Sequence, residues 1–406
     1  MNIAIIVRKL NVRGGTQRLA LTLARELAMR GQKVVLYTFV FDRTNCFTEL
    51  LEGREVVSLG SLPQYQRRGF FPFRLFFSIW GFVRENSAAK KLSRLIATDT
   101  DILNPHDQVS YRVAAYFKKR KSHVPSVWMM NDLPTKAFSF LREKEMNPSL
   151  RMNSAKAVMV RLLDWYDYMR FIRHQERIIV LDNRDKEWVK IFFKKDAEVI
   201  RIGIDSNAFS CVRREHAVRK EVRLLMNGIF FPHRRFEDGI NALQILIENG
   251  YDAFLTIIGD AADKEYAQKL RDIIARSSLE ARIKLLGKVS QEALQSAYGE
   301  HDIFLFPSHL QSWGLAVFEA IASGCPVIVS KTAGASEVLT DGKNALLVHS
   351  KSSEEIAGAV KRLVDDPSLF QTLSRNGRLF VEEHMTWERY ADHVMRVFGE
   401  VIKKRI

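Results

Sequence analysis

The sequence has little cysteine and no long apolar run. Its 406 residues include three scattered cysteines (Cys46, Cys211 and Cys325), an odd number that predicts neither a disulfide framework nor a zinc site. No apolar run approaches the ~20 residues that a membrane-spanning helix needs. The first apolar stretch, Asn2–Val7, is typical of a strand rather than a signal peptide. There is no internal repeat or low-complexity tract. We therefore expect a cytoplasmic protein with about two globular domains.

Acidic residues are scarce in the first half of the chain. The net charge is +15, and residues 1–205 hold 36 Lys and Arg against 21 Asp and Glu, whereas residues 206–406 hold 26 of each. The whole excess therefore lies in the first half, which indicates an anionic partner for that half, either a membrane or nucleic acid. Because no nucleic-acid-binding motif accompanies the charge, we expect no nucleic-acid partner.

The segment Arg67–Arg94 concentrates basic and aromatic residues. It contains seven Lys or Arg, seven aromatic residues and a single acid, Glu85. Its apolar centre, Leu75–Val83, is too short to cross a bilayer. A basic, aromatic helix is typical of an element that lies in the membrane interface, and a core helix with a solvated basic rim is the alternative. We predict that this segment contacts an anionic membrane surface.

The stretch Phe304–Val329 predicts a strand, a loop, a helix and a second strand. Ile303–Phe306 is expected to be a buried strand, and Leu315–Ala322 repeats apolar residues at helical spacing, with Ser312 placed to cap the helix. Gly324 and Pro326 end that helix, and Val327–Val329 begins the next strand. The loop Pro307–Gly314 and the helix start offer free N–H groups and the positive end of a helix dipole, which suit a diphosphate.

Glu319 lies inside this otherwise apolar helix. A buried carboxylate needs a partner, because an unpaired buried charge is costly. A neighbouring Arg or backbone group would suffice, and a ligand is the other candidate. A second loop of the same kind follows the first strand, where Gly14-Gly15 precedes a helix expected from about Gln17 to Arg30. Such a glycine pair also occurs in ordinary tight turns.

Strands and helices are expected to alternate along most of the chain, which predicts an α/β fold with parallel sheets. Lys136–Glu176 is expected to be one long, basic, amphipathic helix. Asp99-Thr100-Asp101 is formally a D-x-D metal-binding motif, but it precedes a strand, so we expect a loop or cap role. The other expected strands include Lys33–Phe41, Val124–Met130, Arg177–Leu181, Val222–Met226, Ala253–Gly259, Ile283–Leu286 and Lys343–Val348.

With these features the chain resembles the retaining glycosyltransferases of family 4, which have the GT-B fold of two Rossmann-like, doubly wound parallel-sheet domains facing a cleft. The family pattern of Glu, seven residues and Glu, followed by Gly-x-Pro-Val, is matched at Glu319 and at Gly324–Val327, but Gln311 stands where the first Glu is expected. The resemblance covers nearly the whole chain and is strongest in residues 222–348. It implies an acceptor-binding domain at 1–205, a nucleotide-sugar-binding domain at 206–385, and a C-terminal helix, 386–406, that returns to the first domain.

The resemblance also implies roles for individual residues. Glu319 would bind the ribose, Gln311 the donor sugar, and a basic residue after Gly228 the diphosphate, although Ile229 occupies the usual basic position. The predicted catalytic residues are Gln311, Glu319, Arg234, Arg235, His106 and Asn131, where Asn131 stands at a position that is often His. The predicted donor-binding residues are Gly14, Gly15, Gly228, Ser312, Trp313, Gly314, Leu315 and Glu319.

The activity that the resemblance implies is retaining, metal-independent hexosyl transfer from a UDP- or GDP-linked sugar to a lipid-linked or surface-glycan acceptor, without a cofactor, by an enzyme peripheral to the inner face of the membrane. Another GT-B activity, such as a nucleotide-sugar epimerase or a phosphorylase, is an alternative. A non-catalytic, membrane-attached partner subunit is the second alternative. Gln311, Ile229 and Asn131 favour it, because each departs from the residue expected at its position.

Overall fold

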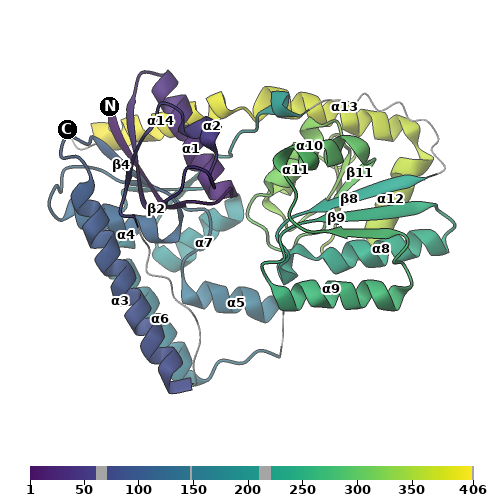
Figure 1. Cartoon of the computed structure of the whole chain (residues 1–406), viewed down its shortest axis with the longest axis horizontal. Coiled ribbons are helices and arrows are strands. Elements are labelled where there is room, and N and C mark those ends of the chain that lie inside the picture. Colours follow the sequence, from purple (N-terminus) through teal and green to yellow (C-terminus); the bar gives the residue numbers. More distant parts are fainter. Residues whose placement is uncertain (61–70, 147–148, 210–220, 405–406) are drawn as a thin grey trace. The chain divides into compact units, whose positions relative to one another are not determined.

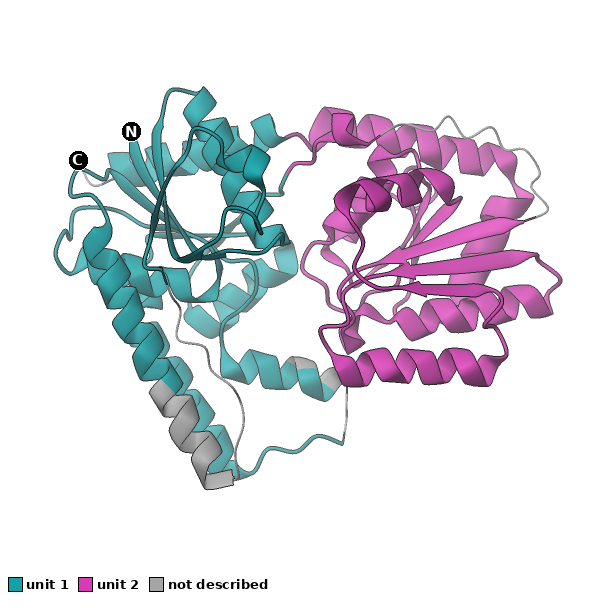
Figure 2. Cartoon of the chain, viewed as in Figure 1, with its two compact units in different colours: residues 1–202, 387–406 teal, residues 203–386 magenta. Residues whose placement is uncertain are grey.

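The computed structural model describes residues 1–60, 71–146, 149–209 and 221–404. The chain forms two compact units, shown in Figure 2: unit 1 comprises Met1–Ile202 and Trp387–Ile406, and unit 2 comprises Gly203–Thr386. None of the helices formed by these described residues is long and apolar enough to cross a bilayer.

Unit 1 is built on parallel strands. β1 (Asn2–Leu10) lies between β2 and β4 in the order β3-β2-β1-β4, and parallel bridges Leu103↔Ser126 and His106↔Met129 join β4 to a further β5-β6-β7 sheet. Strand order therefore reverses at β1 and β4, so their carboxyl ends lie at a topological switch point. The remaining strands are β2 (Lys33–Phe41), β3 (Glu55–Ser58), β4 (Ile102–Pro105), β5 (Val127–Met129), β6 (Arg177–Val180) and β7 (Ala197–Val199).

Helices pack on the strands of unit 1 (Figure 1), and the C-terminal helix α14 packs against α1. On this helix Asp392 accepts a hydrogen bond of 3.0 Å from the Arg30 guanidinium. The helices are α1 (Gly15–Met29), α2 (Thr48–Leu51), α3 (Phe71–Leu95), α4 (Asp107–Lys118), α5 (Lys136–Met146), α6 (Ser154–Arg170), α7 (Asn183–Phe193) and α14 (Trp387–Lys403), with a 3-10 turn at Ile172–His174.

The prediction of one long helix over Lys136–Glu176 is wrong. The segment contains two helices, α5 and α6, and the 3-10 turn that follows them. Asn153 begins α6 from an extended backbone conformation, and its side chain accepts a 2.8 Å hydrogen bond from the Lys156 N–H. This cap satisfies an N–H group at a helix start, which a continuous helix would not require.

The predicted membrane segment is described only in part. Arg67 and Arg68 lie outside the described residues, and only the backbone is described from Phe71 to Trp80, where it is helical. Near the C-terminal end of α3, the side chains of Ala88, Ala89 and Leu92 are buried in the core of unit 1. That end therefore fits the alternative of a core helix.

Unit 2 has a single six-stranded parallel sheet in the order β10-β9-β8-β11-β12-β13. This is the classic doubly wound order, with its switch point between β8 and β11. The expected α/β architecture of parallel-sheet domains is thus confirmed. Its strands are β8 (Val222–Asn227), β9 (Ala253–Ile258), β10 (Ile283–Leu286), β11 (Ile303–Phe306), β12 (Val327–Ser330) and β13 (Leu346–Val348).

The helices of unit 2 pack against its sheet, and those within residues 236–274 and 356–373 share one apolar core with the strands. They are α8 (Phe236–Glu248), α9 (Lys264–Ser277), α10 (Gln291–Glu300), α11 (Leu315–Ala322), α12 (Ser353–Asp365) and α13 (Pro367–His384), with 3-10 turns at Ser206–Ala208, Pro232–Arg234 and Gly334–Glu337. The predicted strand–loop–helix–strand unit is present, since β11 and β12 are fully buried on either side of α11.

Candidate functional site

The carboxyl ends of β8 and β11 diverge at the switch point of unit 2, where doubly wound folds bind their ligands. β8 ends at Asn227 and leads to Gly228, while β11 ends at Phe306 and leads to the polar loop before α11. The two loops are joined, because the His309 N–H donates a 2.7 Å hydrogen bond to the His233 carbonyl. This edge collects the polar groups predicted for the donor.

Arg234 lies at the centre of this edge. Its guanidinium is 3.5 Å from where a Cβ on Gly228 would stand, and it lies over the Phe306 ring, 5.9 Å from the centroid. Burial lowers the pKa of Arg234 to about 10. Its Nε is buried without a hydrogen-bond acceptor, and no described carboxylate pairs with it. Arg234 is partly buried, and removing a cation from water without a counter-charge is costly, so this position favours an anionic ligand.

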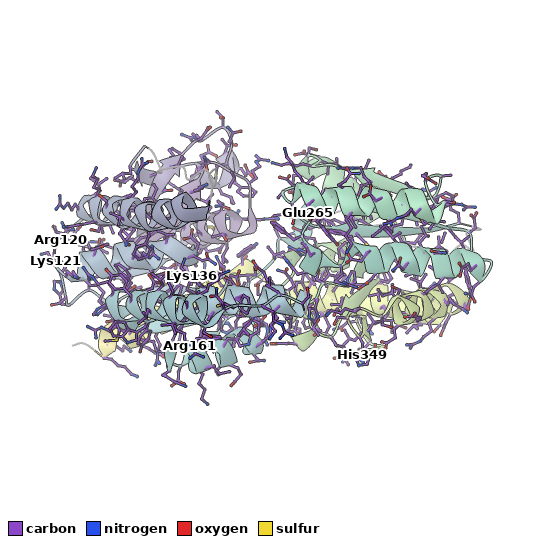
Figure 3. All side chains as sticks on the ribbon, turned by 90° about the horizontal axis from the view of Figure 1, so that it is seen from below. Arg120, Lys121, Lys136, Arg161, Glu265 and His349 are labelled. Atoms are coloured by element: carbon purple, nitrogen blue, oxygen red, sulfur yellow. The ribbon has the colours of Figure 1, made fainter. Side chains whose placement is uncertain are left out.

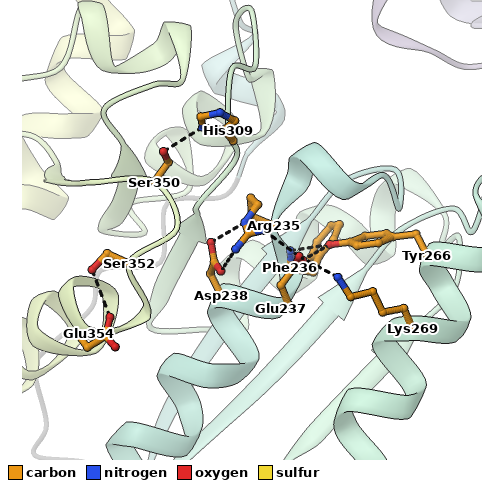
Figure 4. Close-up of polar contacts among 10 residues, drawn as sticks. All are labelled: Arg235, Phe236, Glu237, Asp238, Tyr266, Lys269, His309, Ser350, Ser352 and Glu354. Carbon is orange, nitrogen blue, oxygen red and sulfur yellow. Dashed lines mark hydrogen bonds and ion pairs between the residues drawn. The ribbon is translucent and has the colours of Figure 1, made fainter. Parts of the chain in front are cut away.

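Arg235 has a different environment from its neighbour (Figure 4). Its guanidinium pairs with Asp238 and Glu237, and the Arg235 Nε–Asp238 Oδ2 distance is 2.9 Å. Tyr266 donates a hydrogen bond to the other oxygen of Glu237, and Lys269 approaches the same carboxylate at 3.6 Å. Arg235 also has a left-handed φ of 57° at the start of α8. Its charge already has partners, so the geometry favours Arg234 over Arg235 as the diphosphate ligand.

Gly314 forms the start of α11, and the prediction that Ser312 caps this helix is wrong. Gly314 is the N-cap residue with φ +99°, and no side chain caps the helix. A Cβ at Gly314 would stand 2.8 Å from the Phe306 ring, so both the conformation and the close contact require glycine. The backbone that begins α11, with its free N–H groups, therefore lies close to the Phe306 ring, which the Arg234 guanidinium also approaches.

Glu319 is buried in α11, where its carboxylate is hydrogen-bonded to a tyrosine. Tyr298 on α10 donates a 3.0 Å hydrogen bond to Glu319 Oε2, and the same hydroxyl accepts a 3.0 Å bond from Asn227 Nδ2. Burial and the Glu319 charge raise the pKa of Tyr298 well above its ordinary value. The chain Asn227–Tyr298–Glu319 links α11 to the end of β8. No sequence signal connects Tyr298 with a glutamate 21 residues later.

The remaining predicted residues of unit 2 belong to the loop before α11 or to the first position of that helix. The Gln311 carbonyl accepts a 2.9 Å hydrogen bond from the Gly334 N–H, and its side chain is partly exposed. Trp313 is 2% exposed and stacks on Phe318 at 4.9 Å, with a buried indole N–H that finds no acceptor among the described residues. Ser312 and Leu315 are partly exposed. The structure thus brings together the unit 2 residues predicted for the donor.

In unit 1 the predicted residues lie at the ends of β1, β4 and β5. Gly14 and Gly15 begin α1, and Asn131 donates a 3.1 Å hydrogen bond from Nδ2 to the hydroxyl of Thr16 in the same turn. The Asn131 Oδ1 atom is buried without a hydrogen-bond donor among the described residues. The structure therefore brings Asn131 and the glycine turn together, although neither glycine has a positive φ.

His106 is fully buried at the end of β4, and burial lowers its pKa to about 3. Its Nε2 is 2.8 Å from Asn104 Oδ1, and since Asn104 Nδ2 donates to the Val127 carbonyl, we assign the proton to Nε2. The neutral Nδ1 is then a buried acceptor without a described donor. Burial has the opposite effect on the adjacent Asp107 carboxyl and raises its pKa to about 6.

Neither unit shows a metal centre in its described part, where no three His, Cys, Asp or Glu side chains gather in a suitable arrangement. Asp99 and Asp101 bind the first strand instead: Asp101 accepts a 2.7 Å hydrogen bond from the Asn2 N–H, and Asp99 accepts one of 3.1 Å from the Asn2 side chain. The loop role predicted for this pair is confirmed.

Two family models match the chain, one over each half. Glycosyltransferase Family 4 matches residues 13–208, and Glycosyl transferases group 1 matches residues 212–380. An uncharacterized glycosyltransferase of Methanocaldococcus jannaschii is 23% identical over 361 residues, 85% of this chain and 88% of the relative. The capsular polysaccharide biosynthesis glycosyltransferase CapM of Staphylococcus aureus is 24% identical over 165 residues, 41% of this chain and 42% of the relative.

Solved structures of similar fold cover almost the whole chain. HepE of Anabaena, solved with UDP and glucose, has a TM-score of 0.72 and 16% identity over 98% of this chain and 100% of its own. Sucrose-phosphate synthase from Thermosynechococcus elongatus has a TM-score of 0.74 and 16% identity, with both chains covered in full. At such identities the likeness shows the shared fold alone.

Proposed function

Because this chain belongs to the family 4, group 1 glycosyltransferases, we propose that it moves a hexosyl residue from a nucleotide-diphosphate sugar to an acceptor, with retained anomeric configuration. The observation that carries the proposal is Arg234, a partly buried cation at the switch point of unit 2 that lacks a described counter-charge. A diphosphate supplies that charge. HepE, which shares the fold, was solved with UDP and glucose, which supports a UDP-linked donor; a GDP-linked donor is the alternative.

The leaving diphosphate develops negative charge as the sugar departs, and fixed positive groups lower that barrier. Arg234 and the N–H groups at the start of α11, from Ser312 to Leu315, supply such groups, since the Arg234 guanidinium and the Gly314 backbone both lie close to the Phe306 ring. In this proposal they act without a metal ion, and Arg235 positions the loop by binding Asp238. Glu319, held by Tyr298, accepts hydrogen bonds from the ribose, and Gln311 contacts the sugar hydroxyls.

We assign the acceptor side to unit 1. Its switch point carries His106 beside Asn104 and Asn131 beside the Gly14-Gly15 turn, so polar groups gather at the carboxyl ends of its strands. The neutral His106 Nδ1 and the Asn131 Oδ1 are acceptors without described donors, which suits the hydroxyl groups of a sugar acceptor.

A panel of nucleotide sugars tests the enzymatic proposal. Release of UDP or GDP from one donor, persisting in EDTA and giving the same anomer in product and donor by NMR, is the expected result. Absence of turnover with every donor, together with activity gained in Gln311→Glu, would instead favour the non-catalytic partner subunit. An epimerase would convert the donor sugar without transferring it.

We also propose that unit 1 contacts the inner face of an anionic membrane. There the enzyme would reach a lipid-linked or surface-glycan acceptor. The +15 charge lies in residues 1–205, and Arg67–Arg94 combines cations with aromatics. Each basic residue near an anionic bilayer contributes about 1 kcal/mol, which salt screens over ~8 Å. Binding to anionic liposomes should weaken with salt yet persist, because aromatic insertion resists salt.

Variants separate these two contributions to liposome binding. Replacing Phe73, Phe76 and Trp80 by Ser should remove the salt-resistant part. Charge reversal at Arg67, Arg68, Lys90 and Lys91 should remove the salt-sensitive part. A wild-type protein that stays in the supernatant with anionic liposomes at low salt would contradict the membrane proposal without affecting the assignment of the donor site.

A further inference from the structure

Unit 1 contains an apolar cavity of about 560 Å³ between α5, α6 and the end of α7. Phe140 and Leu141 of α5, Val160 and Trp165 of α6, and Phe192 of α7 line it. Ligand pockets measure about 300–1,000 Å³ and are lined mainly by apolar and aromatic side chains. The size and the lining therefore suit a hydrocarbon ligand.

The helices that line this cavity are fixed to one another by specific contacts. Asp164 on α6 accepts hydrogen bonds from the Lys136 and Ala137 N–H groups at the start of α5, at 2.8 and 2.9 Å. On its other side α5 packs on α7 through Phe138 and Trp188, whose ring centroids are 4.3 Å apart. Since α5 is fixed to both neighbours, the cavity is a built feature of the unit.

An exposed apolar stripe on α6 leads to the mouth of the cavity. Val158, Leu162 and Trp165 follow helical spacing and are 57, 60 and 60% exposed. Trp165 belongs to both the stripe and the cavity wall. Among the described residues, α5 and α6 carry six of the fifteen large hydrophobic side chains that are exposed. Such a concentration marks an interaction site rather than ordinary surface.

A basic side chain also lines this cavity. Arg161 lines the cavity and is exposed, and no described carboxylate pairs with it; Figure 3 labels it together with Lys136. Lys136–Arg170 contains seven Lys and Arg and four Asp and Glu. Of those acids, Asp164 accepts hydrogen bonds from backbone N–H groups, and Asp167 forms an ion pair with Arg112. An occupant with an apolar chain and a negative head fits both the lining and the charge.

We propose that this cavity binds the hydrocarbon chain of a lipid phosphate, with the phosphate at Arg161. The proposal rests on the proposed function, because such a lipid would be the anchored acceptor. It places a second, chain-specific lipid contact on α5 and α6, separate from the segment Arg67–Arg94. Binding can be measured without turnover, so the two proposals can fail independently.

Titration calorimetry with dodecyl phosphate below its micelle concentration should show saturable binding of one molecule per chain. Affinity should rise about fourfold for each methylene added from decyl to dodecyl phosphate. Ala157→Trp fills the cavity from α6 and should reduce affinity at least tenfold. The matched control is Val158→Trp, since Val158 is exposed and does not line the cavity; it should bind within twofold of wild type.

The head group is tested by a second pair of variants. Arg161→Gln should weaken dodecyl phosphate about tenfold and leave dodecanol unchanged, whereas Lys156→Gln, on the same helix but outside the cavity lining, should change neither. If Ala157→Trp does not fold, an alkyl phosphate whose hydrocarbon chain ends in bromine provides another measurement. It should quench Trp165 fluorescence in the wild type, and Trp165→Phe should lose that part of the quenching.

Four results would overturn the proposal. Equal losses in Ala157→Trp and Val158→Trp, or binding that never saturates, would mean adsorption on the exposed stripe. Dodecyl phosphate that does not bind would refute it directly. A wild-type dimer that Ala157→Trp dissociates, with no lipid bound, would assign the surface to a second copy of this chain. UDP titration of the same proteins tests the donor site separately, so a loss of UDP binding alone leaves the lipid site standing.

Discussion

Replacing Arg234 and Arg235 by methionine, one at a time, should change stability in opposite directions. A pKa lowered from 12.5 to about 10 means that keeping Arg234 charged costs the folded protein about 3 kcal/mol at neutral pH. Arg234→Met removes that cost and places an apolar chain of similar length against Phe306. We expect the free energy of unfolding of unit 2 to rise by about 1–3 kcal/mol.

Arg235→Met has the contrary effect, because it leaves acidic partners behind. Asp238 is 2% and Glu237 8% exposed, and both pair with Arg235. Removing one partner of a buried ion pair costs about 3–5 kcal/mol. Tyr266 and Lys269 still contact Glu237, so we expect about 3 kcal/mol of destabilisation.

Donor affinity should separate the two variants further. Losing a charged hydrogen bond to phosphate costs about 1.5–3 kcal/mol, so Arg234→Met should weaken UDP binding about 10- to 150-fold. Arg235→Met, measured at a temperature where it is folded, should lose less, and Arg234→Lys should retain part of the affinity.

Scanning calorimetry and UDP titration measure these two quantities. Because the chain has two units, the transition of unit 2 must be followed by itself, for instance through its shift on adding UDP. The reasoning is refuted if Arg234→Met destabilises unit 2 as much as Arg235→Met does. It is also refuted if UDP binds Arg234→Met as tightly as the wild type.

Three other outcomes are expected. Gln311→Glu should stay within about tenfold of wild-type turnover while Gln311→Ala loses more, because an amide can bind sugar hydroxyls; an inactive Gln311→Glu enzyme would contradict this. Tyr298→Phe removes the hydrogen bond that Tyr298 donates to Glu319 and should lower the melting temperature through a loss of about 1–3 kcal/mol of stability, and an unchanged melting temperature would contradict that role. The unfolded chain protonates His106 near pH 6.5 and the folded chain only near 3, so this residue lowers stability as pH falls between those values. His106→Asn should flatten that decline in urea titrations, and an unchanged slope would contradict the assignment; Asp107, with its pKa raised to about 6, acts in the opposite direction in every variant.

The sequence by itself determined the elements whose signals are local. Strands β11 and β12 were predictable because a strand buried on both faces is a continuous apolar run. The end of α11 was predictable because a glycine followed closely by a proline is a local signal for a helix end. In the structure Gly324 has the left-handed φ, 74°, that this position favours. The family motif placed Glu319 on that helix.

Tertiary structure decided which polar side chains already have a hydrogen-bond or ion-pair partner within the protein. Arg234 and Arg235 are adjacent and chemically identical, and only the fold gives Arg235 two carboxylates while leaving Arg234 against Phe306. In the same way, Glu319 is bonded to Tyr298 of another helix. The carboxylates that pair with Arg235 are only two and three residues away in the chain. The position of Arg234 against Phe306 and the Tyr298–Glu319 hydrogen bond depend instead on contacts between distant segments, which no local pattern encodes.

Local signals also failed where two conformations compete. Ser312 was a plausible helix cap, but the close approach of Phe306 to Gly314 made the glycine the first residue of the turn into α11. Helical spacing continued across Lys136–Glu176, yet Asn153 begins a separate helix there. The cavity beside α6 arises from that division, because α5 can then be fixed to Asp164 and to α7 at once. The amphipathic pattern of Lys136–Glu176 could be recognised in the sequence. Which of its apolar side chains stay exposed was decided only by packing.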